Sequence, residues 1–78
     1  MRILITGSNG LLGQKLVSLL CDKEIDVIAT SRGDNRLPDN NQYQYESMDI
    51  VDRQEVLSIL EKHKPDVVIN TAAMTNVD

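Results

Sequence analysis

The hydrophobic positions of the chain occur in two arrangements, which are short continuous runs and longer stripes of helical spacing. Continuous apolar runs at residues 2–6, 25–30 and 66–70 predict buried strands of a parallel sheet. A weaker alternation over residues 42–48 predicts a short strand near an edge of that sheet. Residues 11–22 carry leucines at helical spacing, and a second helical pattern lies between Asp52 and Pro65.

The first helical stretch has one position that its pattern alone does not explain. Its expected apolar stripe consists of Leu12, Leu16, Leu19 and Leu20, with Gln14, Lys15 and Ser18 largely on the other side. Gly13 lies within the first turns, where glycine costs roughly 1 kcal/mol against alanine. We therefore expect this glycine to allow close packing of the helix against the first strand.

The second helical stretch has recognisable signals at both ends. Asp52 is the expected N-cap, and Glu55 completes a capping-box pattern. Its apolar face is expected to contain Val56, Leu57, Ile59 and Leu60. Positive charge at Lys62, His63 and Lys64 suits the negative end of the helix dipole, and Pro65 stops the helix. We interpret His63 as such a terminal cation and not as a catalytic base.

The order strand, helix, strand, strand, helix, strand predicts an α/β fold. It corresponds to a partial Rossmann-type, doubly wound parallel sheet, a βαββαβ arrangement with right-handed crossovers. Such a sheet normally continues through a second half. We therefore expect residues 1–78 to be the amino-terminal part of a larger domain, whose fourth strand exposes an edge.

Composition excludes several classes of protein. The net charge is −4 and no basic run occurs, so binding to nucleic acid is not supported. No apolar run approaches the roughly 20 residues that span a membrane, and no signal peptide precedes the first strand. The single cysteine, Cys21, excludes an internal disulfide framework and is interpreted as a packing residue. These features predict a reduced, cytoplasmic protein, and no metal site is expected.

The loop between the first strand and the first helix carries the clearest chemistry. It has the spacing of three glycines expected where a backbone holds a pyrophosphate at a helix N-terminus. Gly7 would make the tight turn, Gly10 would allow close approach of the phosphates, and Gly13 would make the helix–strand contact. The residues expected to surround the dinucleotide are Ser8, Asn9, Leu11 and Leu12, the two leucines through backbone N–H groups. A glycine-rich turn without a ligand is the alternative. A P-loop is excluded because no Gly-Lys-Ser/Thr follows at the required spacing.

The end of the second strand bears on the choice between NADP and NAD. An acidic residue about 20 residues past the glycines would bind the ribose 2′-hydroxyl of NAD. Here Ser31 and Arg32 are present instead, a pair suited to a 2′-phosphate. NADP is therefore the predicted cofactor. NAD stays open because Asp34 lies two residues further on, and Arg32 could also be a solvated loop cation.

Two further strand ends are expected to contribute to the site. Asp49 would accept a hydrogen bond from the adenine amino group, with Ile50 against the ring, unless the pair is only a polar turn leading to Asp52. After the fourth strand, Asn70, Ala72 and Ala73 would leave room for the ligand, with the alanines contacting its ribose or phosphates through backbone. A tightly packed strand end is the alternative there. Tyr43 and Tyr45 are interpreted as structural, because neither is followed by lysine four residues later.

Together these motifs resemble an extended short-chain dehydrogenase/reductase. The TGxxGxxG loop at residues 6–13 is specific to that superfamily, and the run at residues 65–78 resembles its dTDP-4-dehydrorhamnose reductase family. The resemblance covers nearly the whole chain but only the amino-terminal part of such an enzyme. Residues 1–78 are therefore expected to be the amino-terminal part of an NAD(P)-binding Rossmann domain, with no substrate domain present.

The resemblance implies NADPH-dependent reduction of dTDP-4-dehydro-L-rhamnose to dTDP-L-rhamnose by the parent protein. The family's catalytic Tyr-x-x-x-Lys pair would lie beyond Asp78, so no catalytic residue is assigned here and the chain alone is expected to have no reductase activity. Nicotinamide dinucleotide and, in the parent, a nucleotide-sugar are the expected partners, and a homodimer of the parent stays open. Two alternatives remain: an NAD-dependent sugar-nucleotide epimerase or dehydratase, or a regulatory subunit like that of methionine adenosyltransferase.

Overall fold

The computed structural model describes residues 1–23, 25–35 and 43–71, and within them each expected element is present. In chain order the elements are β1 (Arg2–Thr6), α1 (Leu11–Asp22), β2 (Asp26–Ser31), β3 (Tyr43–Ser47), α2 (Arg53–His63) and β4 (Val67–Asn70). The bounds of β1 and α1 are those expected from the sequence. The second strand begins and ends one residue later than expected, so Ser31 is its last residue.

The four strands form one parallel sheet in the order β3-β2-β1-β4. Ile3 of β1 is in register with Val27 of β2 on one side and with Val67 of β4 on the other. The prediction of an α/β, Rossmann-like partial fold is therefore confirmed. β4 lies at an edge of this sheet, as expected, and its residues Val67 and Val68 are 39% and 50% exposed.

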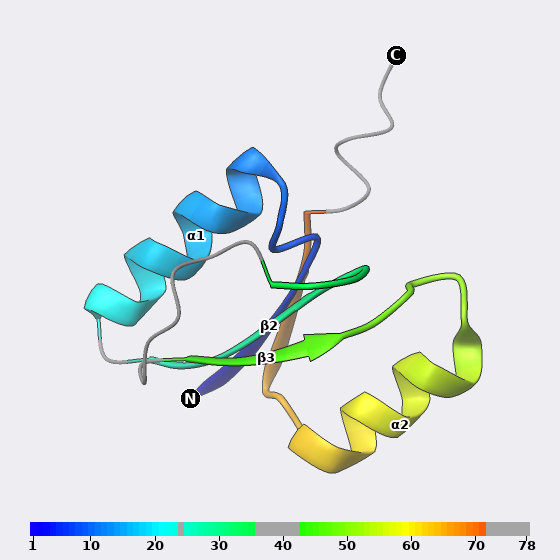
Figure 1. The fold of residues 1–78 in the computed structure, drawn as a ribbon. Coiled ribbons are helices and arrows are strands. Elements are labelled where there is room, and N and C mark those ends of the chain that lie inside the picture. The colour runs from blue at the N-terminus through cyan, green and yellow to red at the C-terminus, as the bar shows by residue number, and fades with distance from the viewer. Residues whose placement is uncertain (24, 36–42, 72–78) are drawn as a thin grey trace.

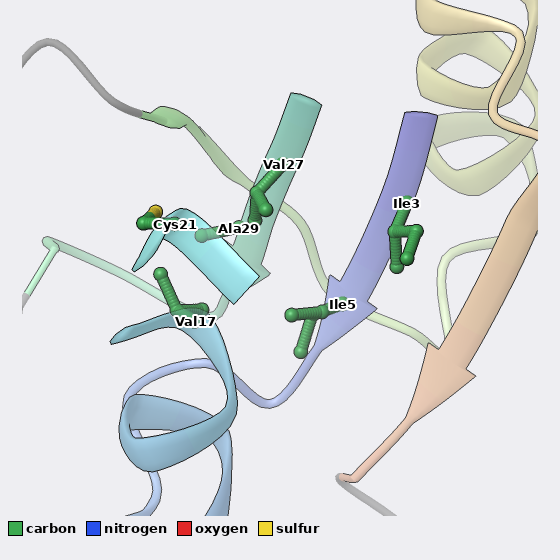
Figure 2. Packing of buried hydrophobic residues seen from close by; sticks show 6 residues of the cluster. All are labelled: Ile3, Ile5, Val17, Cys21, Val27 and Ala29. Carbon is green, nitrogen blue, oxygen red and sulfur yellow. The ribbon is translucent and has the colours of Figure 1, made fainter. Parts of the chain in front are cut away.

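Alternating residues of the central strands divide the interior into two cores. On one face, α1 covers a cluster that Figure 2 shows, with Val17 and Cys21 of the helix lying over strand residues. Its buried members are Ile3, Ile5, Val17, Cys21, Val27 and Ala29. On the other face, α2 covers Leu4, Ile28, Met48 and its own Ile59. The two helices therefore pack on opposite sides of the sheet (Figure 1).

The expected apolar stripe of α1 is wrong in part. Its buried positions are Gly13, Val17 and Cys21, whereas Leu12 and Leu19 are 48% and 53% exposed. Leu16 and Leu20 pack against the core from the sides of this stripe. A helix that has Gly13 against the chain below it must present the i, i+4, i+8 row that contains this glycine. Close approach of the backbone therefore decides the helix rotation, although it leaves the hydrophobic side chains of Leu12 and Leu19 exposed.

The N-terminus of α2 is capped as expected, but the capping box is incomplete. The Asp52 carboxylate accepts a hydrogen bond from the Glu55 N–H at 3.2 Å. The Glu55 carboxylate, however, accepts from the N–H of Asp49 at 2.6 Å, while the Asp52 N–H donates to the Asp49 carbonyl at 3.0 Å. The turn before the helix thus supplies its own partner for Asp52 and leaves Glu55 to bind one turn further back. Leu57, expected in the apolar face, is 53% exposed.

The C-terminal turn of α2 engages the sheet through its charged residues. His63 is buried, and its Nε2 atom lies 2.6 Å from a carboxylate oxygen of Glu46 on β3. Lys62 Nζ lies 2.7 Å from the same oxygen. These contacts join α2 to the edge strand β3.

The two helices of the described residues are α1 and α2, and neither has the length and hydrophobicity that crossing a membrane requires.

Candidate functional site

The carboxyl ends of β1, β2 and β4 meet at one edge of the sheet, together with the N-terminus of α1. β1 and β4 are neighbours in the sheet, while the helix that follows β1 and the helix that precedes β4 lie on opposite faces. The position between them is the topological switch point, where open α/β sheets bind ligands. Most of the predicted site residues that the structure describes lie at these strand ends, on the loops that follow them or in the first turn of α1, and Asp49 and Ile50 follow β3.

The glycine loop makes a tight turn between β1 and α1. Gly7 has a φ of 73°, in the left-handed region that favours glycine. The Gly10 N–H donates to the Gly7 carbonyl at 3.0 Å, and Gly10 is the N-cap residue, with no side chain capping the helix. The first helical hydrogen bond from the cap runs from Gln14 N–H to the Gly10 carbonyl at 2.9 Å. The N–H groups of residues 11–13 precede that bond and have no acceptor within the helix.

Gly13 is required by the turn and not, as expected, by direct packing on β1. A Cβ atom at this position would overlap the Gly7 carbonyl oxygen and lie 2.8 Å from Ser8 Cα. Both atoms belong to the backbone of the glycine loop, so neither can rotate away. The absence of a side chain at Gly13 lets the first turn of α1 close over the loop, which brings the free N–H groups to the switch point.

Ser8 lies beneath this turn and is fully buried. Its N–H donates to the Thr30 carbonyl of β2 at 2.9 Å. Its hydroxyl oxygen has no hydrogen-bond partner among the residues that the structure describes. An unpaired buried hydroxyl costs about 1–3 kcal/mol. Ser8, which the sequence predicts to lie beside a dinucleotide, thus has a buried hydroxyl oxygen that is not satisfied by the described residues.

The second loop brings two predicted residues together that are far apart in sequence. Arg32 follows β2 directly, and its Nε atom lies 3.8 Å from a carboxylate oxygen of Asp49, which follows β3. The side chains are 81% and 37% exposed, respectively. An ion pair so exposed contributes little to stability, so both groups can engage a ligand at small cost. Ile50, next to Asp49, is 41% exposed.

Asn9 faces this second loop in the structure. Its side-chain amide donates to the Asp34 carbonyl at 2.8 Å and to the Arg32 carbonyl at 3.5 Å. Tyr45 of β3 holds the same segment, because its hydroxyl lies 2.7 Å from the Gly33 carbonyl and 3.1 Å from the Ser31 carbonyl. Burial is the largest influence on Tyr45 and raises the pKa of its hydroxyl, which therefore stays protonated and able to donate at neutral pH. Tyr45, which was interpreted from the sequence as structural, has a structural role in supporting a loop of the candidate site.

The end of β4 is joined to the end of β1 by hydroxyl groups. Thr6 donates from its hydroxyl to the side-chain oxygen of Asn70 at 2.6 Å. The Thr71 hydroxyl binds the carbonyls of Thr6 and Gly7, the latter at 3.2 Å. Asn70 is therefore engaged in holding the corner together, while Ala72 and Ala73 lie outside the described residues.

Sequence reasoning missed four supporting residues: Thr6, Gln14, Tyr45 and Thr71. Gln14 donates from its side-chain amide to the Asn9 carbonyl at 2.7 Å and so closes the glycine loop from the helix side. The threonines at two strand ends were the available signal, because a hydroxyl there can satisfy the last carbonyls of a neighbouring strand. The partners themselves depend on strand order, which the residue pattern leaves open.

The loop chemistry fits a phosphorylated ligand. A turn with a glycine cradle and free helical N–H groups suits an anion. The structure describes no group of three or more His, Cys, Asp or Glu side chains able to hold a metal ion, a statement limited to residues 1–23, 25–35 and 43–71. The candidate site is thus built from backbone donors, one cation and one carboxylate.

Comparison with known proteins gives a consistent picture. Residues 1–78 match the family described as "RmlD substrate binding domain". The chain is 37% identical to a dTDP-4-dehydrorhamnose reductase of Aggregatibacter actinomycetemcomitans, over 99% of this chain and 22% of that protein. It is 32% identical to a dTDP-glucose 4,6-dehydratase of Salmonella typhimurium, over 100% of this chain and 24% of that protein.

A solved structure shares the fold. The Bordetella bronchiseptica enzyme WbmH, in complex with NAD+, superimposes with a TM-score of 0.79 at 24% identity, over 90% of this chain and 25% of that one. The chain therefore spans a quarter or less of the length of these three proteins, between 22% and 25%.

Proposed function

The chain belongs to the RmlD substrate binding domain family, and from that membership we propose that it forms the NADP-binding amino-terminal part of a sugar-nucleotide reductase. The proposed reaction of the whole protein is reduction of dTDP-4-dehydro-L-rhamnose to dTDP-L-rhamnose. The relative named dTDP-4-dehydrorhamnose reductase, 37% identical over 99% of this chain, supports this reaction. The observation that carries the proposal is the juxtaposition of the glycine cradle with the Arg32–Asp49 pair at one edge of the sheet.

Most of the predicted residues contact the dinucleotide in this proposal, whereas the Asn9 side chain binds the carbonyls of Arg32 and Asp34. The backbone N–H groups of Leu11 and Leu12, at the start of α1, would hold the pyrophosphate, with Gly7, Gly10 and Gly13 shaping the turn. The Ser8 hydroxyl would gain a partner when the dinucleotide binds. The Asn70 corner would leave room for the dinucleotide, and Ala72 and Ala73 would contact its ribose or phosphates through backbone.

The adenosine end of the dinucleotide would bind at the second loop. Asp49 would accept from the adenine amino group, and Ile50 would lie against the ring. Ser31 and Arg32 would hold a 2′-phosphate, because a guanidinium forms paired, charged hydrogen bonds with phosphate oxygens. Bound NADPH supplies a hydride in reductases of this kind. The residues of this chain bind and orient that cofactor, and the residues that protonate the substrate are proposed to lie outside it.

A second candidate is the same region of an NAD-dependent sugar-nucleotide dehydratase or epimerase. The relative named dTDP-glucose 4,6-dehydratase, 32% identical over the full chain, favours it. In that case Asp34, whose carbonyl is held by Asn9, would lie near the ribose hydroxyls in place of a 2′-phosphate.

Binding of NADPH and NADH to wild-type and Arg32→Asp chains tests the choice between these candidates. If the reductase assignment is right, the substitution weakens NADPH binding by at least about tenfold and leaves NADH binding nearly unchanged, since one charged contact is worth roughly 1.5–3 kcal/mol. Lys23→Asp, at the far end of α1, makes the same change in net charge and serves as the control. Equal losses of affinity for both dinucleotides would refute the 2′-phosphate assignment. Unchanged affinity for both would mean that Arg32 does not belong to the site.

A further inference from the structure

The segment that carries Arg32 is held by its carbonyl groups. The Ser31 carbonyl accepts from the Met48 N–H at 2.8 Å and from the Tyr45 hydroxyl, and the Gly33 carbonyl accepts from the same hydroxyl at 2.7 Å. The carbonyls of Arg32 and Asp34 accept from the Asn9 side chain. Four consecutive carbonyl groups, at residues 31–34, therefore have partners that come from the glycine loop, from β3 or from the residue just after it.

Two of these partners belong to different parts of the candidate site. Asn9 lies in the glycine loop, and Gln14 of α1 binds its backbone carbonyl at 2.7 Å. Tyr45 is in register with Ala29 of β2, and its ring packs against the core beneath α1. The backbone of residues 31–34 is thus tied both to the proposed pyrophosphate loop and to the sheet.

The side chain of Arg32 has no comparable support. It is 81% exposed, and its Nε atom lies 3.8 Å from a carboxylate oxygen of Asp49. Gly33, the next residue, has a φ of 78°, in the left-handed region that favours glycine. The position of this group relative to a bound phosphate is therefore set by the backbone beneath it and not by side-chain packing.

We propose that Tyr45 and Asn9 are positioning residues that set the dinucleotide preference of the site by holding the backbone of residues 31–34. The inference rests on the proposed function, because it assigns the segment a 2′-phosphate to select. A charged group binds a phosphate more tightly when the backbone that carries it is ordered before the ligand arrives, since ordering a free loop during binding subtracts from the affinity. Loss of the support lowers affinity for the dinucleotide that carries the phosphate and has little effect on the other one.

The test measures the Kd of NADPH and of NADH by titration for wild-type chain and for Tyr45→Phe. This variant keeps the ring and removes only the hydroxyl that binds Ser31 and Gly33. We expect the ratio of NADH to NADPH dissociation constants to fall about fivefold to tenfold, the effect of losing hydrogen bonds worth about 1 kcal/mol. Tyr43→Phe is the matched control. Tyr43 lies two residues earlier on the same strand, and its hydroxyl lies 2.8 Å from the side-chain amide of Asn35, which is outside residues 31–34. We expect that control to keep the wild-type ratio.

Gly33→Ala provides a second route to the same segment. A Cβ atom there would meet nothing within 4 Å, so the only penalty is the positive φ of 78°. We expect this variant to lower the ratio in the same direction as Tyr45→Phe, and its circular dichroism spectrum checks that it folds.

The outcomes separate the inference from the proposed function. A lowered ratio in Tyr45→Phe and Gly33→Ala, with an unchanged ratio in Tyr43→Phe, supports the inference. A wild-type preference for NADPH that survives both substitutions, or equal losses of affinity for both dinucleotides, overturns the inference alone. A wild-type chain that folds and binds neither dinucleotide overturns the proposed function and the inference with it.

Discussion

Replacement of Gly13 by alanine tests whether the glycine loop depends on backbone contact. Two opposing effects operate at this position. Alanine is favoured over glycine in a helix interior by about 1 kcal/mol. The added Cβ, however, would overlap the Gly7 carbonyl oxygen and lie 2.8 Å from Ser8 Cα and 2.9 Å from the Gly7 carbonyl carbon.

The clash outweighs the gain in helix propensity. Overpacking usually costs about 1–3 kcal/mol, and a contact with three backbone atoms belongs at the upper end of that range because no rotamer change relieves it. We therefore expect Gly13→Ala to destabilise the chain by about 2 kcal/mol. With a urea m-value of about 1 kcal/mol/M for a small domain, this lowers the unfolding midpoint by about 2 M.

Urea unfolding followed by circular dichroism measures this shift, and Ser18→Ala is the control. Ser18 lies on the exposed side of the same helix, where alanine gains helix propensity without meeting the loop. We expect that control to be neutral or slightly stabilised. If Gly13→Ala is as stable as Ser18→Ala, the glycine is not needed for closure of the turn, and the explanation given for the rotation of α1 is wrong as well.

Two other changes follow from the contacts. Hydrogen bonds from Lys62 and His63 lower the pKa of Glu46 from its ordinary value of 4.5. The stability that this carboxylate contributes is therefore present above pH 4.5 and is lost as the pH falls through its lower folded pKa. Acid unfolding curves of Glu46→Gln should lack this pH-dependent loss of stability, and a curve identical to that of the wild type would contradict the role of the cluster. Thr71→Val removes the hydroxyl that binds the carbonyls of Thr6 and Gly7, and it should lower the free energy of unfolding in urea by about 1 kcal/mol. Thr71→Ser keeps that hydroxyl and is the control. Equal losses of stability in both variants would mean that the methyl group and not the hydroxyl stabilises the corner.

Local sequence signals were sufficient for the elements and their order. Continuous apolar runs identified β1 and β4, helical spacing identified α1, and Asp52 with Pro65 bracketed α2. These signals depend on neighbours in the chain, such as side chains one turn apart or an N-cap and the third residue after it. The glycine spacing likewise located the turn that Gly7 makes, because a positive φ is a property of a single residue.

The tertiary structure decided which face each helix presents and which loops meet. The sequence favoured a leucine stripe on α1, but contact of Gly13 with the glycine loop selects the row of Val17 and Cys21 instead. Arg32 and Asp49 are separated by the loop between β2 and β3, and they become neighbours only because these two strands pair in parallel.

The sequence by itself therefore determined the strand and helix order, the glycine turn and the family. Only the tertiary structure decided that Tyr45 and Asn9 support the segment around Arg32. The physical reason is the range of the interactions. Helix spacing, caps and glycine turns act between residues close along the chain, whereas these hydrogen bonds form between segments that are brought together by the packing of the sheet and its helices.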